Sequence, residues 1–239
     1  MLWFRKYFML ALKCDSPIVE AFEHGSTRVV VSGYYTKKYF MDDMFCMIDA
    51  DAGTETYYKN NQIHRDGYPA IISLDGWVEW YDQGVLYARE TPEDGMSWYD
   101  RYRRLHRTDG PAIETREGTK YWIHHGYRYR KDGPAIEFAN GVKIWVHTFQ
   151  RPRKTSKIHR TDGPAILIAN GDKIWIQRDV PHREDGPAIE CISGYKAWYE
   201  RGKCLREENA NSRKITYRYG WLDGIDGFNL FIPKLCALN

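Results

Sequence analysis

The chain has 239 residues, nine Trp, eighteen Tyr and a formal net charge of +3. This length allows one large domain or two small ones with a sizeable core. Abundant aromatic residues beside an ordinary charge content are typical of a folded, β-rich protein and exclude a disordered one. The five cysteines lie far apart without a CxxC pair (Cys14, Cys46, Cys191, Cys204, Cys236). We therefore expect a reduced, cytoplasmic protein without a structural zinc ion.

Residues 1–41 contain no repeat and are predicted to form a separate N-terminal segment or cap. The apolar stretch at 7–12 is short for a signal peptide and lacks a small-residue cleavage site. A bilayer span would need about 20 residues. Residues 3–6 (WFRK) resemble an interfacial anchor in composition, but we favour a buried first strand or helix over membrane contact.

An internal repeat follows, and its clearest form is HRTDGPAI at 106–113 and 159–166. With the Arg as position n, Asp follows at n+2, Gly at n+3, Pro at n+4, a turn Gly at n+11 and Trp at n+15. The four full copies are Arg107, Asp109, Gly110, Pro111 and Trp122; Arg130, Asp132, Gly133, Pro134 and Trp145; Arg160, Asp162, Gly163, Pro164 and Trp175; and Arg183, Asp185, Gly186, Pro187 and Trp198. The step is 23 residues from Arg107 to Arg130 and from Arg160 to Arg183.

Weaker copies extend the same frame to residues 42–225. Arg65 begins an earlier unit, Tyr57 occupies the Trp position of the unit before it, and Arg206 begins a decayed unit. The array then has about seven units, with 226–239 as a C-terminal tail. The 23-residue spacing is interrupted twice. Residues 88–106 are a spacer or truncated unit, and residues 146–159 carry seven additional residues.

Each unit predicts a β-hairpin, in which an Asn-Gly or Asp-Gly turn joins a PAIE strand to a KIWV-like strand. A turn centred on n+10 and n+11 would place the Ile at n+6 opposite the Trp at n+15, as a core pair. The pairs would be Ile113 with Trp122, Ile136 with Trp145, Ile166 with Trp175 and Ile189 with Trp198. Because a 23-residue hairpin needs neighbours to bury its apolar face, the predicted fold is all-β. It is an elongated, twisted antiparallel sheet with atypical ends.

The 23-residue hairpin period, the turn glycines and the aromatic strand resemble MORN repeats. The HRxDGPA motif is similar to the repeat sequence of divergent MORN-like proteins of bacteria, large phages and giant viruses. The resemblance covers about three quarters of the chain and leaves out residues 1–41. It implies a non-catalytic hairpin array that contacts proteins or membranes, such as an adaptor in the host cytoplasm if a phage encodes it.

The His-Arg-x-Asp group has the components of an active site, but a catalytic constellation occurs once, whereas this one recurs with each hairpin. We therefore expect its residues to join successive turns. The single histidines of different units (His64, His106, His159, His182) have no Cys partner. The adjacent His124 and His125 would face opposite sides of a strand and chelate poorly. We expect no metal, cofactor or catalytic site in the repeats.

The charge is uneven, with nine Lys or Arg against sixteen Asp or Glu in 1–100, and fifteen against five in 101–160. Basic residues among aromatics are typical of surfaces that bind nucleic acid, although an acidic protein would be attracted equally. The candidate residues are Arg101, Arg103, Arg104, Arg128, Arg130, Lys131, Arg151, Arg153, Lys154 and Lys157.

The favoured hypothesis is a non-enzymatic scaffold for protein–protein interaction, with nucleic-acid binding through 101–160 as the alternative. Its contact surfaces would be 88–106, 146–159 and the non-repeat ends. An enzyme site in those ends, for example at Glu20, Glu23, His24 and Ser26, is the least favoured because their spacing matches no known motif. Edge strands of the array could also pair two copies of the chain.

Overall fold

The computed structural model describes residues 44–49, 51–150 and 154–208 in full, and only the backbone of strands within 20–39 and 218–234. The chain divides into two compact units, Met1–Arg128 and Tyr129–Asn239. Among the described residues every regular element is a β-strand, so the predicted all-β class is confirmed. Consequently, no described segment is a helix of the length and apolarity needed to cross a bilayer.

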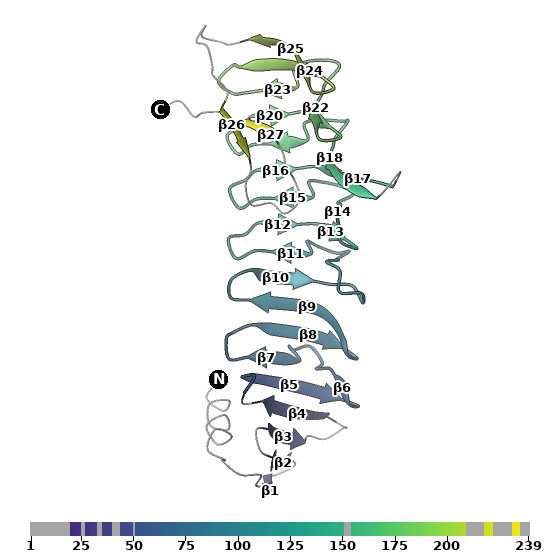
Figure 1. The fold of residues 1–239 in the computed structure, drawn as a ribbon, viewed down its shortest axis with the longest axis vertical. Helices are drawn as coiled ribbons and strands as arrows, with labels where there is room; N and C mark the ends of the chain where they lie inside the picture. Colours follow the sequence, from purple (N-terminus) through teal and green to yellow (C-terminus); the bar gives the residue numbers. More distant parts are fainter. Residues whose placement is uncertain are drawn as a thin grey trace. The chain divides into compact units, whose positions relative to one another are not determined.

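The first unit is an antiparallel ladder in which each long strand pairs with the next along the chain (Figure 1). Its strands are β1 (Glu20–His24), β2 (Thr27–Ser32), β3 (Tyr35–Tyr39), β4 (Met44–Asp49), β5 (Thr54–Lys59), β6 (Gln62–Ile63), β7 (Ile71–Ser73), β8 (Val78–Asp82), β9 (Val85–Thr91), β10 (Gly95–Trp98), β11 (Ile113–Glu114) and β12 (Lys120–Tyr121). The two-residue β6 folds back on β5, which goes on to pair with β7.

The second unit continues the same pattern of antiparallel pairing. Its ladder strands are β15 (Ile136–Glu137), β16 (Lys143–Ile144), β19 (Ile166–Leu167), β20 (Lys173–Ile174), β23 (Ile189–Glu190), β24 (Lys196–Glu200) and β25 (Lys203–Glu208). A separate backbone pair joins β26 (Arg218–Trp221) to β27 (Phe231–Lys234).

The numbers missing from these ladders belong to short side hairpins, which lie beside the ladder strands (Figure 1). They are β13 (Ile123–His124) with β14 (Tyr127–Arg128), β17 (Val146–Phe149) with β18 (Thr155–Ile158), and β21 (Ile176–Gln177) with β22 (Val180–Pro181). One hairpin per repeat was expected, but these repeats have two. The second turn lies at n+18 and n+19, and the seven additional residues of 146–159 lengthen it.

The predicted pairing of the Ile at n+6 with the Trp at n+15 is wrong by one residue. Ile113 pairs with Tyr121, and the same step pairs Ile136 with Ile144, Ile166 with Ile174 and Ile189 with Ala197. The first turn contains three residues instead of two, with the Gly at n+11 alone in the left-handed region (φ +88° at Gly141). Because side chains alternate along a strand, the one-residue difference moves each Trp to the other face.

The core is therefore aliphatic. The alanines at n+5 are completely buried (Ala70, Ala112, Ala135, Ala165, Ala188). The isoleucines at n+6, n+14 and n+16 in the second unit are 0–3% exposed (Ile136, Ile144, Ile166, Ile174, Ile176, Ile189). Burial stabilises each by about 1.5–3 kcal/mol relative to an exposed side chain. The lysines at n+13 lie two residues before the Trp residues, so both point to the face of the sheet opposite the isoleucines. These lysines are exposed (Lys120, Lys143, Lys173, Lys196).

Parts of the interruptions and ends of the repeat lie among the described residues. In 88–106, β9 and β10 form a hairpin that ends at Trp98, which is the arrangement of a truncated unit. The ladder also extends into 1–41, because β1 to β3 pair in sequence and β3 pairs with β4. The side chains of Glu20, Glu23 and His24, as well as Ser26 and the tail apart from β27, lie outside the described part.

Candidate functional site

The arginine at position n is held by a set of contacts that we call the arginine clamp. In the last full repeat, Nε of Arg183 donates to Oδ1 of Asp185 at 2.9 Å. Its Nη1 donates to the Pro187 carbonyl at 3.2 Å and to Oε1 of Glu190 at 2.7 Å. The guanidinium carbon also lies 3.9 Å from the centre of the Trp175 ring, a cation–π distance. One side chain thereby ties a turn, a strand and the preceding repeat together.

The arginine clamp recurs in both units of the molecule. Its members are Arg107 with Asp109 and Trp98, Arg160 with Asp162 and Trp145, Arg130 with Pro134 and Glu137, Arg65 with Pro69 and Tyr57, and Arg206 with Trp198. Tyr57 and Arg206 belong to the weaker copies, and they still make the ring contact at 3.7 and 3.9 Å. The arginine is therefore held by neighbouring groups at each of these positions, and Asp109, Asp162 and Asp185 contribute to holding it in three of them.

The glycine at n+3 leaves room for the guanidinium. A Cβ added at Gly186 would lie 3.0 Å from Cζ of Arg183, and the same distance is found for Gly110, Gly163 and their arginines. The guanidinium therefore lies between the aromatic ring and the glycine backbone. Hydrogen bonds from the arginine are also the main reason why the pKa values of Asp109, Asp162 and Asp185 are below the usual value.

The histidine at n−1 accepts a hydrogen bond from the second turn. Nδ1 of His182 accepts the backbone N–H of Arg201 at 3.2 Å, and His64, His106 and His159 accept from Gln83, His125 and Arg178 at 3.2–3.3 Å. Each donor residue has a positive φ, between +46° and +54°. The histidine thus fixes a strained turn, and in its neutral form the proton resides on Nε2.

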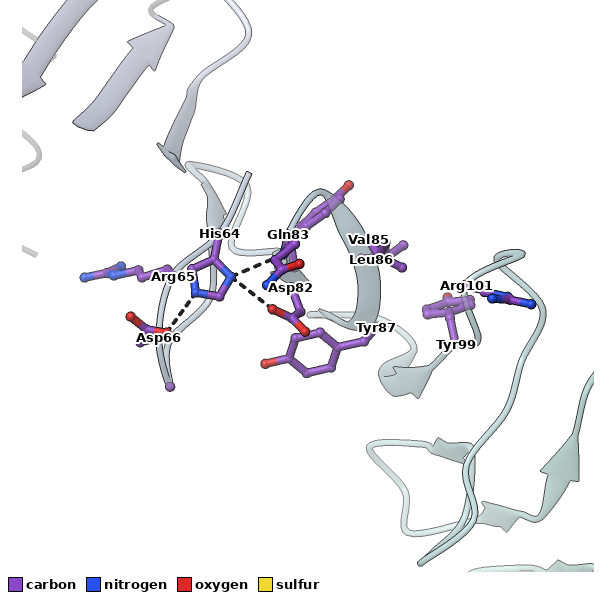
Figure 2. A pocket seen from close by; sticks show the side chains of 12 residues that line it. His64, Arg65, Asp66, Asp82, Gln83, Val85, Leu86, Tyr87, Tyr99 and Arg101 are labelled. Carbon is purple, nitrogen blue, oxygen red and sulfur yellow. Dashed lines mark hydrogen bonds and ion pairs between the residues drawn. The ribbon is translucent and has the colours of Figure 1, made fainter. Parts of the chain in front are cut away.

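Grooves form beside these histidines. Figure 2 shows the groove of the first unit, where His64 lies between Asp66 and the turn at Asp82 and Gln83. This groove has a volume of about 660 Å³ and extends to Arg101. A groove of about 600 Å³ lies between the Arg160 and Arg183 turns of the second unit. Both grooves start at the turn that follows the His-Arg pair of a repeat, so each arises where successive repeats stack.

The loop after β10 is the most distinctive part of the first unit. The carboxylate of Asp100, 7% exposed, accepts Nε of Arg104 at 2.8 Å and the backbone N–H groups of Tyr102 and Arg104. Nδ1 of His125 also lies 2.8 Å from Oδ2 of Asp100. Burial alone would raise the pKa of Asp100, but these hydrogen bonds outweigh it and hold the pKa far below the usual value.

This loop brings together His106, His124 and His125, which we call the histidine cluster. One ring nitrogen of each lies within 4.8 Å of the others. The rings of His106 and His125 are stacked at 4.1 Å, and the His124 ring meets both at steep angles. The prediction that His124 and His125 face opposite sides was wrong, because His125 lies in the turn with φ +51° and the alternation of a strand ends at His124. Burial and the neighbouring His125 lower the pKa of His106.

The insertion hairpin, β17–β18, carries the longer turn of the second unit. Phe149 lies 4.7 Å from His147 and 5.3 Å from His159, measured between ring centres. The Arg178 guanidinium lies 5.1 Å from the Phe149 ring. These contacts fasten the hairpin to the next repeat, and Lys154 in the loop after Phe149 is exposed.

The described members of the ten basic candidates differ in exposure and in pairing. Arg101, Arg103, Lys131 and Lys154 are exposed, whereas Arg128 is half-buried. Arg104 is paired with Asp100, Arg130 with Glu137 and Lys157 with Asp179. Arg151 and Arg153 lie outside the described residues. Arg101 and Arg103 are exposed on either side of Tyr102, which is 63% exposed.

No protein-family model and no curated protein matches the chain. Among solved structures, it is similar to the G-box domain of the microcephaly protein CPAP, for which a role in centriole elongation was suggested. The identity is 14%, the coverage is 75% of this chain and 80% of that chain, and the TM-score is 0.23. It is also similar to the TCP10c domain of Drosophila melanogaster Sas-4, with 16% identity, 66% and 90% coverage and a TM-score of 0.18. TM-scores this low support no conclusion about function.

Proposed function

We propose that the protein is a non-enzymatic, MORN-like repeat scaffold that binds another protein through the interruptions of its repeat. The observation that carries this proposal is the recurrent arginine clamp. In both units the arginine and aspartate that resemble an active site bond to each other within a turn, and the arginine contacts a Trp ring of the preceding repeat. A solenoid of this kind offers extended surfaces, and insertions into repeats commonly supply the binding face.

The insertion hairpin is the first surface to test, because a matched short form exists in the same chain. The β21–β22 hairpin has the two-residue turn Arg178–Asp179, and its pairs correspond to Val146–Ile158 and His147–Lys157 of β17–β18. Replacing residues 148–156 by Arg-Asp would remove seven residues and retain these two pairs. The variant therefore deletes the projecting part without changing the repeat frame.

The experiment is chemical cross-linking of the full chain to proteins of its source cell, with the cross-linked lysines identified by mass spectrometry. The scaffold proposal expects a partner linked at Lys154 or Lys157. The decisive result is loss of the link at Lys157, because the shortened hairpin retains this lysine and lacks Lys154. A chain that keeps the hairpin length but has residues 148–156 in scrambled order is the control for specificity. Unchanged partner recovery with the shortened hairpin would show that this insertion is not the contact surface.

Binding of a polyanion is a second candidate, supported by the exposed Arg101, Tyr102 and Arg103. Basic side chains beside an exposed aromatic ring suit phosphate contact and base stacking. Retention on a heparin column at low salt should fall when Arg101 and Arg103 are both replaced by Ala, and should be unaffected when Lys196 and Lys203 of the second unit are replaced instead. A full-length protein that flows through at about 50 mM salt would exclude this function.

A further inference from the structure

We propose that His106, His124 and His125 form a binding site for a divalent transition-metal ion of the zinc type, with Asp100 positioning one ligand. This inference goes beyond the scaffold function and does not depend on it. The three side chains come from the turn before β11, the end of β13 and the turn after it, so that the fold itself brings them together.

The composition of the site selects the class of metal. Three neutral imidazoles are typical ligands of Zn²⁺, Cu²⁺ and Ni²⁺, whereas Ca²⁺ and Mg²⁺ require oxygen ligands. The nearby charges of Asp100 and Arg104 pair with each other at 2.7 Å. Their pairing offsets the repulsion that Arg104 alone would exert on a bound cation. A water molecule or a partner's side chain would complete four-coordination.

Asp100 provides the arrangement that metal-binding histidines commonly have. Its carboxylate lies 2.8 Å from Nδ1 of His125, and Nη2 of Arg104 lies 3.1 Å from the same nitrogen. Metal binding would place the ring proton on Nδ1, donated to Asp100, and would require Nη2 of Arg104 to turn away, because a guanidinium can only donate. The lone pair of His125 is then on Nε2, the atom available to a metal ion. Asp100 is itself fixed by two backbone N–H groups and by Arg104, so it acts as a positioning residue.

Metal binding requires a small rearrangement of the rings. Tetrahedral zinc with Zn–N bonds of about 2.0–2.1 Å needs nitrogens about 3.3 Å apart, and the present separations are up to 4.8 Å. The stacked rings of His106 and His125 must therefore tilt towards each other. His106 also gives up the hydrogen bond that its Nδ1 accepts from the His125 N–H, since a metal-bound neutral imidazole has no free lone pair.

The test is titration of the untagged full chain with zinc chloride, followed by isothermal calorimetry. We expect one zinc ion per chain. His124→Ala and His125→Asn should weaken binding at least tenfold, and Asn is chosen because it tolerates the left-handed backbone of residue 125. Asp100→Asn should weaken binding about 10–100-fold. In wild-type protein, zinc should also speed hydrogen exchange at the His125 amide, because its acceptor is withdrawn.

His182→Ala is the matched control. His182 holds the Arg201 N–H as His106 holds that of His125, but its turn carries Glu200 and Arg201 in place of the two histidines. Its zinc affinity should stay within twofold of wild type. Absence of zinc binding, or binding that the His124 and His125 variants leave unchanged while they remain folded by circular dichroism, would overturn the proposal. Equal loss in His182→Ala would also overturn it, because the effect would then come from the repeat fold.

Discussion

The Arg107 and Arg183 repeats hold their arginines alike but differ in what surrounds the second turn. Both arginines contact an Asp at n+2 and the indole ring of a Trp that precedes them in the chain. The second turn is His125–Gly126 in one repeat and Arg201–Gly202 in the other. Beside the first lies the loop of Asp100, whereas the second joins the long, exposed strand β25. The shared contacts build the array, and the differing contacts are where a repeat can acquire a separate function.

The arginine clamps themselves differ in strength, which gives the largest predicted effect. Nη1 of Arg183 lies 2.7 Å from Glu190, but Nη1 of Arg107 lies 3.9 Å from Glu114. Arg183→Ala should lower the free energy of unfolding by about 2–4 kcal/mol, from lost charged hydrogen bonds and the cation–π contact. Arg107→Ala should lower the free energy of unfolding by less, because its contact with Glu114 is longer. Urea denaturation followed by circular dichroism measures both.

Lys196→Ala is the control for these substitutions, because Lys196 is exposed and should change stability by less than about 0.5 kcal/mol. If Arg107→Ala and Arg183→Ala are equally destabilising, the contact with the acidic residue at n+7 does not contribute. If neither exceeds the lysine control, the arginine clamp is not a source of stability.

The glycine at n+3 is the next position to test. Gly186→Ala places a Cβ 3.0 Å from Cζ of Arg183, and the resulting shift of the guanidinium should cost about 1–3 kcal/mol. In an Arg183→Ala background the same glycine substitution should be nearly neutral, because the crowding atom is gone. Additive effects in this double-mutant cycle, measured by urea denaturation, would contradict the role assigned to the glycine.

The histidine at n−1 should have a smaller effect. His182→Ala removes the acceptor of the Arg201 N–H, a loss of about 0.5–1.5 kcal/mol. His106→Ala should lower the free energy of unfolding by a similar amount, because it removes the acceptor of the His125 N–H. Of these two variants, only His106→Ala should also weaken zinc binding. Thermal or urea unfolding of both variants makes the comparison. A His182→Ala protein as stable as wild type would show that the second turn does not need its acceptor.

The sequence was sufficient for the all-β class and for the repeat frame, because equal spacing of Arg, Gly, Pro and Trp requires equal local structure. It was insufficient for the register, since two-residue and three-residue turns both accommodate the same glycine, and one residue decides which face the Trp occupies. The contact of Arg183 with Trp175 joins two repeats, and spacing within one repeat does not reveal it.

The histidine cluster illustrates the same limit at the candidate site. Adjacent side chains point to opposite faces only while a strand continues, and strand β13 ends at His124. The rule therefore does not apply to His125. The signal was the Gly that follows His125, because His-Gly at n+18 and n+19 corresponds to Gln83–Gly84 and Arg201–Gly202 in other repeats. Recognising the second turn from these glycines would have placed His125 outside the strand. The participation of Asp100 depends on a loop with no counterpart in the regular repeats and had no such signal.

The smallest predicted effect is a pH dependence at the insertion hairpin, where the histidine at n−1 has neighbours that the other repeats lack. Burial is the main cause that lowers the pKa of His159 from 6.5, and His147 and Arg178 lower it further, while Asp179 opposes them. A base whose pKa is lower when folded binds fewer protons in the native state. Its contribution to stability is therefore complete above pH 6.5 and is lost as the pH falls below 6.5 towards the folded-state pKa.

Nuclear magnetic resonance titration of the His159 ring should give a pKa below 6.5, and His147→Ala should raise it by removing one of the repelling groups. The shortened hairpin retains His147 but lacks Phe149, whose ring lies 5.3 Å from His159, so it should also raise the pKa by reducing the burial of the ring. If the His159 pKa is at or above 6.5, or does not respond to His147→Ala, the ring is not enclosed by the base of the hairpin. The contacts of Phe149 and His147 with His159 would then not form in solution, and the insertion hairpin would be attached to the array only through its two strands.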